Sequence, residues 1–233
     1  MYLADVRGEN DFVQRLAIKV LNLDMLENDD IVGRQRDEAR LLAQLNHDHI
    51  VKVIELTEID GRPAVLMEYV EGIDASRLMK SALFPPRAAL EVGGAVASAL
   101  HTAYNACSPV TGKPLRVVHR DIKPANVVIT ANGGVKVLDF GVARAEFERE
   151  GLTRSVAFGT ARYMAPESWM TNDIGAAVDL YALGISMVEM LSGQQISRCP
   201  LSPRAYEDHI DALVLGVDQP EWGARWKADL HAL

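Results

Sequence analysis

Residues 119–126 read His119-Arg120-Asp121-Ile122-Lys123-Pro124-Ala125-Asn126, and Asp139-Phe140-Gly141 follows after a short interval. The interval predicts a β-hairpin, because two apolar, β-branched runs flank a turn-forming sequence. The runs are 127–129 and 135–138, and the turn is Ala131-Asn132-Gly133-Gly134. We therefore expect the two quoted stretches to lie together at the open end of one hairpin.

The register of this hairpin predicts a metal site. Folding the chain about its glycines pairs Val127 with Leu138, so that Asn126 and Asp139 meet at the open end. An amide oxygen and a carboxylate on neighbouring strand ends suit Mg²⁺, a hard cation that takes few protein ligands and completes its octahedron with water and phosphate oxygens.

Two further side chains add to this point. Asp121 lies five residues before Asn126 and brings a second carboxylate close by, while Lys123 contributes a fixed positive charge. A metal ion, a proton acceptor and a cation at one place are what phosphoryl transfer requires.

These stretches match the pattern H-R-D-x-K-P-x-N followed by D-F-G, and the chain resembles the eukaryotic-like serine/threonine protein kinases, in particular their bacterial branch. The resemblance implies one protein kinase domain over residues 1–233. Its expected fold is α+β and two-lobed, with a small β-rich lobe in 1–70 and a larger, mostly helical lobe in 71–233. Further matching pieces occur at Tyr2-Leu3-Ala4, Ala17-Ile18-Lys19-Val20, Glu38, Met67-Glu68-Tyr69-Val70, Gly159-Thr160, Ala165-Pro166-Glu167 and Asp179-Leu180-Tyr181-Ala182-Leu183-Gly184.

The resemblance also implies a function, transfer of the γ-phosphoryl group of ATP to serine or threonine hydroxyls of a protein substrate in signalling. Asp121 would accept or orient the hydroxyl proton, and Lys123 would neutralise the moving phosphoryl group. Asn126 and Asp139 would hold Mg²⁺. Lys19, braced by Glu38, would hold the α and β phosphates of ATP.

The pairing of Lys19 with Glu38 is also expected from the residues themselves. Residues 16–21 read as a strand with apolar residues on both faces, where Lys19 is out of place unless a counter-charge meets it. From residue 29 onward the pattern is helical, and Glu38 lies on its inward stripe, where an unpaired carboxylate costs stability. The alternative is a lysine whose charged end reaches solvent and a glutamate on a solvated helix face.

Two more strands are predicted at 51–56 and 63–68, joined by a turn at Asp60-Gly61. The resemblance makes Glu68-Tyr69-Val70 the hinge, with its backbone amides and carbonyls facing the adenine edge, and Met67 the residue behind the purine. Plain core packing of Met67 is the other interpretation, and the two are compatible.

Two long helices are predicted in the larger lobe. Residues 88–104 have an apolar face, and the stretch that starts at Asp179 is apolar on nearly every side, which predicts a buried helix. The resemblance implies that Asp179 ties the backbone of the catalytic loop. A helix N-cap is a second interpretation that agrees with the first.

The segment 142–164 carries the candidate regulatory residues Thr153, Ser155 and Thr160. Kinases with an arginine at the position of Arg120 are usually switched on by a phosphate in this segment. A phosphate on Thr153 or Ser155 would give Arg120 a doubly charged partner and order the loop. Thr160 is expected to bond to Asp121 and Lys123 instead. The other interpretation of all three residues is a polar, flexible loop.

Composition restricts the class of protein. The net charge of −8 argues against nucleic acid as the principal partner, and no uninterrupted apolar stretch is long enough for a membrane span. The start of the chain lacks the features of a signal peptide, and the two cysteines are expected to be free thiols. These features favour a cytoplasmic protein.

The chain departs from the family's pattern at both ends. The glycine-rich loop is expected upstream of Met1, and the last helices of the larger lobe beyond Leu233, which suggests a truncated kinase domain. A non-catalytic, kinase-like binding module is therefore the alternative function. A small-molecule phosphotransferase of the same fold is disfavoured by Gly159-Thr160 and Ala165-Pro166-Glu167, which are typical of kinases with peptide substrates.

Overall fold

The computed structural model describes residues 1–7, 13–20, 40–82, 84–109, 111–140, 161–169, 175–197, 200 and 202–217. The candidate site residues Glu38, Thr153, Ser155 and Thr160 lie outside this part of the chain, as does most of the helical pattern predicted from residue 29 onward. The predictions made for them stay predictions.

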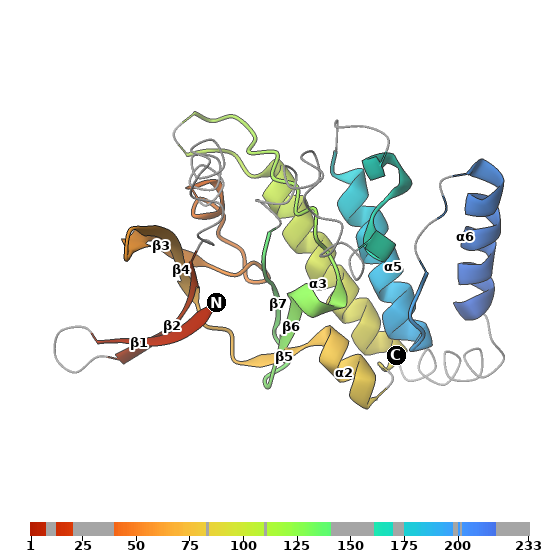
Figure 1. Ribbon diagram of the computed structural model, residues 1–233, viewed down its shortest axis with the longest axis horizontal. Coiled ribbons are helices and arrows are strands. Elements are labelled where there is room, and N and C mark those ends of the chain that lie inside the picture. Colours follow the sequence, from red (N-terminus) through yellow and green to blue (C-terminus); the bar gives the residue numbers. More distant parts are fainter. Residues whose placement is uncertain are drawn as a thin grey trace.

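A four-stranded antiparallel sheet forms the small lobe at one end of the molecule (Figure 1). Its strands lie in the order β1-β2-β4-β3. The turn between β3 and β4 uses Asp60 and Gly61, both with positive φ (51° and 73°), as a two-residue hairpin loop requires. The strands predicted around residues 16–21, 51–56 and 63–68 are confirmed with shifted ends, as β2 Val13–Val20, β3 Val53–Ile59 and β4 Arg62–Glu68. The fourth strand is β1 Tyr2–Arg7.

The larger lobe is mostly helical and begins with a small sheet in the order β5-β6-β7 (Figure 1). Both predicted long helices are present, and α5 lies between α3 and α6. The α+β, two-lobed architecture is thus confirmed. Its elements are β5 Gly72–Asp74, α2 Ala75–Ser81, α3 Pro86–Asn105, the 3-10 turn η3 Pro124–Asn126, β6 Val127–Thr130, β7 Val135–Val137, the turns η4 Ala161–Tyr163 and η5 Pro166–Trp169, α5 Ala177–Ser192 and α6 Pro203–Val217.

The core of the larger lobe lies between α3, α5 and β7. Val92, Val96 and Leu100 of α3 are buried, as the helical period requires. Leu90, the other apolar residue expected on this face, is exposed. Burial of α5 is less complete than its sequence predicts, because Leu180 is exposed. Among the described residues, no helix has both the length and the apolar character needed to cross a bilayer.

The hairpin of β6 and β7 forms as predicted, but its register is different. Val127 pairs with Val137 and not with Leu138. The turn is closed by Gly133 N donating to Thr130 O at 3.0 Å and Thr130 N donating to Gly134 O at 2.9 Å. The loop therefore contains three residues, with Gly133 in the left-handed region at φ 82°, and the expected four-residue loop is wrong.

Candidate active site

The backbone of the loop 119–123 is hydrogen-bonded to a buried carboxylate of α5, that of Asp179. Asp179 accepts hydrogen bonds from the backbone N–H of His119 at 2.6 Å and of Arg120 at 2.7 Å. These bonds hold Arg120 at φ 63°, a left-handed conformation that costs energy for a residue with a Cβ. Burial raises the pKa of Asp179 to about 6, and the two backbone donors act against this rise. The N-cap of α5 is Ala176, so the N-cap interpretation of Asp179 is wrong and the tie to the loop is what the structure contains.

His119 is a structural member of the site, and the sequence pattern predicted no separate role for it. Its ring is fully buried, with Nδ1 accepting from Asp121 N at 3.2 Å and Nε2 lying 3.0 Å from Leu138 O. These partners fit a neutral ring with the proton on Nε2. Burial lowers the pKa of His119 to about 4, which favours the same neutral form. The ring also packs on Phe140, with centroids 4.4 Å apart, so that His119 joins the loop to the end of β7. Its position directly before Arg120-Asp121 was the only available signal.

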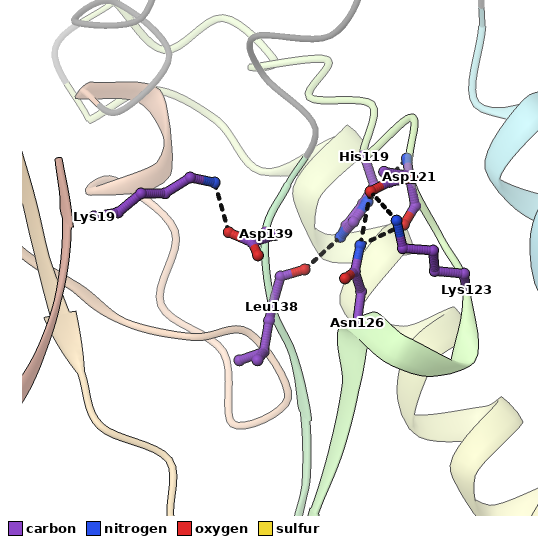
Figure 2. A network of polar contacts seen from close by, with 7 residues as sticks. All are labelled: Lys19, His119, Asp121, Lys123, Asn126, Leu138 and Asp139. Carbon is purple, nitrogen blue, oxygen red and sulfur yellow. Dashed lines mark hydrogen bonds and ion pairs between the residues drawn. The ribbon is translucent and has the colours of Figure 1, made fainter. Parts of the chain in front are cut away.

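Asp121, Lys123 and Asn126 form one bonded cluster (Figure 2). Lys123 Nζ lies 2.8 Å from Asp121 Oδ2. Asn126 Nδ2 donates both to Asp121 O at 2.8 Å and to Asp121 Oδ2 at 2.9 Å. The turn η3, opened by Pro124, makes this approach possible within a few residues of chain. The sequence-based grouping of these three side chains is borne out by their geometry.

Lys19 reaches the same region from the small lobe. Its Nζ lies 2.6 Å from Asp139 Oδ1, with 46% of the lysine side chain and 33% of the aspartate side chain exposed (Figure 2). Asp139 has φ 49°, so the chain turns sharply after β7 at this carboxylate. The described structure thus gives Lys19 a carboxylate partner from the larger lobe, while its predicted pairing with Glu38 stays a prediction.

The proposed magnesium ligands lie at the same end of the hairpin but do not face each other. Leu138 N donates to Asn126 O at 2.8 Å, so the residue opposite Asn126 is Leu138 and Asp139 is one position further along. Each side chain has a different partner, Asp121 for Asn126 and Lys19 for Asp139. Because the amide of Asn126 is planar and its nitrogen faces Asp121, its oxygen points away from Asp121. An amide oxygen and a carboxylate remain a donor set that suits Mg²⁺.

The residues of the predicted hinge follow the end of β4. Met67 is buried and pairs with Ala17 on β2 and Val53 on β3, so the core-packing interpretation is borne out. The side chain of Glu68 turns back and accepts from Lys52 N at 2.8 Å. Tyr69 is exposed, and Val70 is half-buried where the chain passes to β5. A backbone contact with adenine stays a prediction.

Two histidines near the start of β3 have ordinary structural contacts. His47 Nε2 lies 3.1 Å from Ser98 Oγ, and His49 Nδ1 lies 3.0 Å from Val135 O. Among the residues that the structure describes, no group of three or more histidine, cysteine, aspartate or glutamate side chains could hold a metal ion.

Comparisons with known proteins all lead to protein kinases. Residues 7–227 match the family model described as "Protein kinase domain". The chain is 38% identical over 197 residues to the "Tyrosine-protein kinase MasK" of Myxococcus xanthus. The aligned region covers 82% of this chain and 30% of that protein. It is 34% identical over 196 residues to the "Serine/threonine-protein kinase PknB" of Mycobacterium leprae, covering 82% of this chain and 29% of that protein. The chain therefore spans less than a third of the length of these curated relatives.

Solved structures show the same architecture. The kinase domain of Mycobacterium tuberculosis PknI superposes with a TM-score of 0.65 at 28% sequence identity. The superposition covers 92% of this chain and 87% of that chain.

Proposed function

Given that the chain belongs to the protein kinase family, we propose that it transfers the γ-phosphoryl group of ATP to serine or threonine hydroxyls of a protein substrate, as part of a signalling pathway. The observation that carries the proposal is the bonded cluster of Asp121, Lys123 and Asn126, with the Lys19–Asp139 pair beside it. The alternative is a binding module of the same fold without catalysis.

Asp121 is the proposed proton acceptor. Its carboxylate would orient the attacking hydroxyl and take its proton, which is the role of the corresponding aspartate in phosphoryl transfer. Lys123, 2.8 Å from this carboxylate, would balance the negative charge of the transferred group. Its flexible side chain allows the ammonium group to follow that charge over a short distance.

Lys19, Asn126 and Asp139 are the proposed nucleotide and metal ligands. The ammonium group of Lys19 would bind the α and β phosphates, with Glu38 as its brace. The amide oxygen of Asn126 and the carboxylate of Asp139 would hold Mg²⁺. When bound, Mg²⁺ supplies neutralising charge to the phosphates of ATP. Met67, Glu68 and Val70 would line the adenine end.

The identity of the accepting hydroxyl is a separate part of the proposal. The printed names of the relatives differ, since MasK is named a tyrosine-protein kinase and PknB a serine/threonine-protein kinase. Lys123 in the catalytic loop supports serine or threonine. Phosphoamino acid analysis of the labelled product tests this point, and phosphotyrosine as the main product would overturn it while leaving phosphoryl transfer intact.

Two variants with matched controls test catalysis. With millimolar Mg·ATP, Asp121→Asn should lower labelling of a basic protein substrate about 100-fold or more, while Asp48→Asn on the exposed surface should not. Lys19→Met should abolish the thermal shift caused by Mg·ATP, while Lys80→Met should keep it. Equal labelling by the wild type and Asp121→Asn would overturn the enzyme proposal, and absence of any nucleotide-induced shift would favour the binding module.

Regulation by phosphate on Thr153 or Ser155 is proposed with Arg120 as the receiving cation. Arg120 has an exposed side chain next to Asp121. Mass spectrometry after incubation with ATP should find phosphate on Thr153 or Ser155, and Thr160 should remain unmodified because its proposed partners are Asp121 and Lys123. Absence of phosphate from the whole segment 142–164 would remove the switch.

A further inference from the structure

A lysine of the larger lobe forms an ion pair with the start of the segment that connects the lobes. Lys136, in the middle of β7, places Nζ 2.6 Å from Glu68 Oε1 at the end of β4. Glu68 is the last residue of the small sheet before the chain passes to the larger lobe. We propose that Lys136 is a positioning residue that locks residues 68–70 through Glu68 and so sets the affinity for the nucleotide. This inference rests on the proposed function, because it assumes that the backbone of 68–70 receives adenine.

Glu68 is hydrogen-bonded through both its side chain and its backbone. Its Oε1 accepts from Lys52 N at 2.8 Å as well as from Lys136, and its own N donates to Lys52 O at 2.9 Å. Lys136 Nζ also donates to Ile50 O at 3.3 Å. The lysine therefore holds the end of β4 and the chain entering β3 at once.

We call the Lys136–Glu68 ion pair, together with its bonds to Lys52 and Ile50, the lock. Backbone hydrogen bonds to β7 fix the residues next to it. Residues 49–51 lie along β7, with Val137 N donating to His49 O at 2.8 Å and Val51 N donating to Val137 O at 3.1 Å. Val135 and Val137 are buried in the core, and alternation along a strand turns Lys136 to the opposite face. The side chain that reaches Glu68 thus starts from a strand that is paired with β6 on one side and bonded to residues 49 and 51 on the other.

This ion pair is less exposed to solvent than a surface pair. Only 23% of the Lys136 side chain and 30% of the Glu68 side chain are exposed, so solvent and salt screen the two charges incompletely. Fixing the backbone of 68–70 before the nucleotide arrives lowers the ordering cost of binding. Loss of the lock should therefore weaken binding more than it slows the chemical step.

The test compares this pair with an exposed one. Lys136→Met, Glu68→Gln and the double variant are measured beside Arg87→Met and Glu91→Gln, an exposed pair on α3 with both side chains 66% exposed. The KM for ATP should rise about tenfold in each variant of the lock, which corresponds to about 1.4 kcal/mol, with kcat within about twofold. The double variant should be no worse than either single one. Lys136→Arg should restore most of the affinity because it keeps the charge, and the α3 variants should match the wild type.

Hydrogen exchange without nucleotide tests the lock apart from the function. The amides of Tyr69, Val70 and Glu71 should exchange about tenfold faster in Lys136→Met than in the wild type. Unchanged exchange overturns the lock whatever the activity. Faster exchange with an unchanged KM, or a changed kcat alone, overturns the link to nucleotide affinity. Faster exchange in a protein that neither binds nor uses ATP would retain the lock and refute the proposed function. If Lys136→Met fails to fold, Glu68→Gln carries the same comparison.

Discussion

Replacing Tyr163 with phenylalanine removes one hydroxyl from the contact between η4 and α5. This hydroxyl donates to Glu189 Oε2 at 2.6 Å, and only 6% of Tyr163 and 3% of Glu189 are exposed. Burial and the neighbouring carboxylate raise the pKa of Tyr163, so the hydroxyl keeps the proton that it donates. The other oxygen of Glu189 accepts from Ile196 N at 2.9 Å and lies 3.7 Å from Arg162 Nε.

The expected loss of stability follows from these contacts. A hydrogen bond to a charged group contributes about 1.5–3 kcal/mol. Because Glu189 is buried and Arg162 lies beyond hydrogen-bond distance, we expect the upper part of this range, about 2–3 kcal/mol. The phenylalanine ring fills the same space, so no large cavity term is added. For a chain of this size the loss should lower the unfolding temperature by roughly 4–12 °C.

The assay is thermal or urea unfolding of the wild type and Tyr163→Phe, with Tyr104→Phe as the matched control. The ring of Tyr104 lies under the guanidinium group of Arg116, 4.6 Å from ring centroid to Cζ, and phenylalanine keeps this ring. The control should stay within about 0.5 kcal/mol of the wild type. A loss below about 0.5 kcal/mol in Tyr163→Phe would contradict this expectation, because a buried carboxylate would then tolerate losing its shortest hydrogen bond.

The titration of two buried groups and the space around two glycines give the remaining predictions. Long-range ¹H–¹⁵N correlation should find His119 protonated on Nε2 and unchanged between about pH 8 and pH 5, and a ring that titrates near 6.5 would contradict the assigned contacts. The pKa of His119 is about 4 in the folded protein, below the ordinary 6.5. The stability that its neutral ring contributes is therefore lost as the pH falls from 6.5 towards 4. Asp179 has the opposite effect, because its pKa is raised from 3.8 to about 6. The stability that its protonated form contributes is lost as the pH rises from 3.8 to 6. Gly94→Ala should raise stability by about 1 kcal/mol, since the added Cβ meets nothing within 4 Å on the exposed side of α3. Gly72→Ala should lower stability by about 1–3 kcal/mol, since its Cβ would lie 2.5 Å from Ile129 O, and the reverse order in thermal unfolding would contradict both expectations.

The β6–β7 hairpin illustrates which features a local pattern predicts. Its two strands and its turn followed from β-branched runs on both sides of Asn132-Gly133-Gly134. The register did not follow, because either glycine can take the left-handed conformation that closes the turn. The choice of Gly133 shifts the pairing by one residue and places Leu138, not Asp139, opposite Asn126.

In the candidate site, too, some contacts follow from the sequence and others only from the fold. Asp121, Lys123 and Asn126 lie within six residues, and one turn of chain is enough to bring them together. Lys19 and Asp139 are 120 positions apart, and the sequence pointed to Glu38 as the partner of Lys19. The role of Asp179 also needed the fold, since an aspartate in the first turn of a helix fits an N-cap equally well by pattern.

Strand and helix positions, the turn residues and the cluster around Asp121 are properties of the amino-acid sequence, since periodicity and turn chemistry act over a few neighbouring residues. The partners of Lys19, Glu68 and Tyr163 emerge only in the folded chain. Hydrogen bonds and short ion pairs act over a few ångströms, and strand register together with helix packing sets which distant side chains come that close.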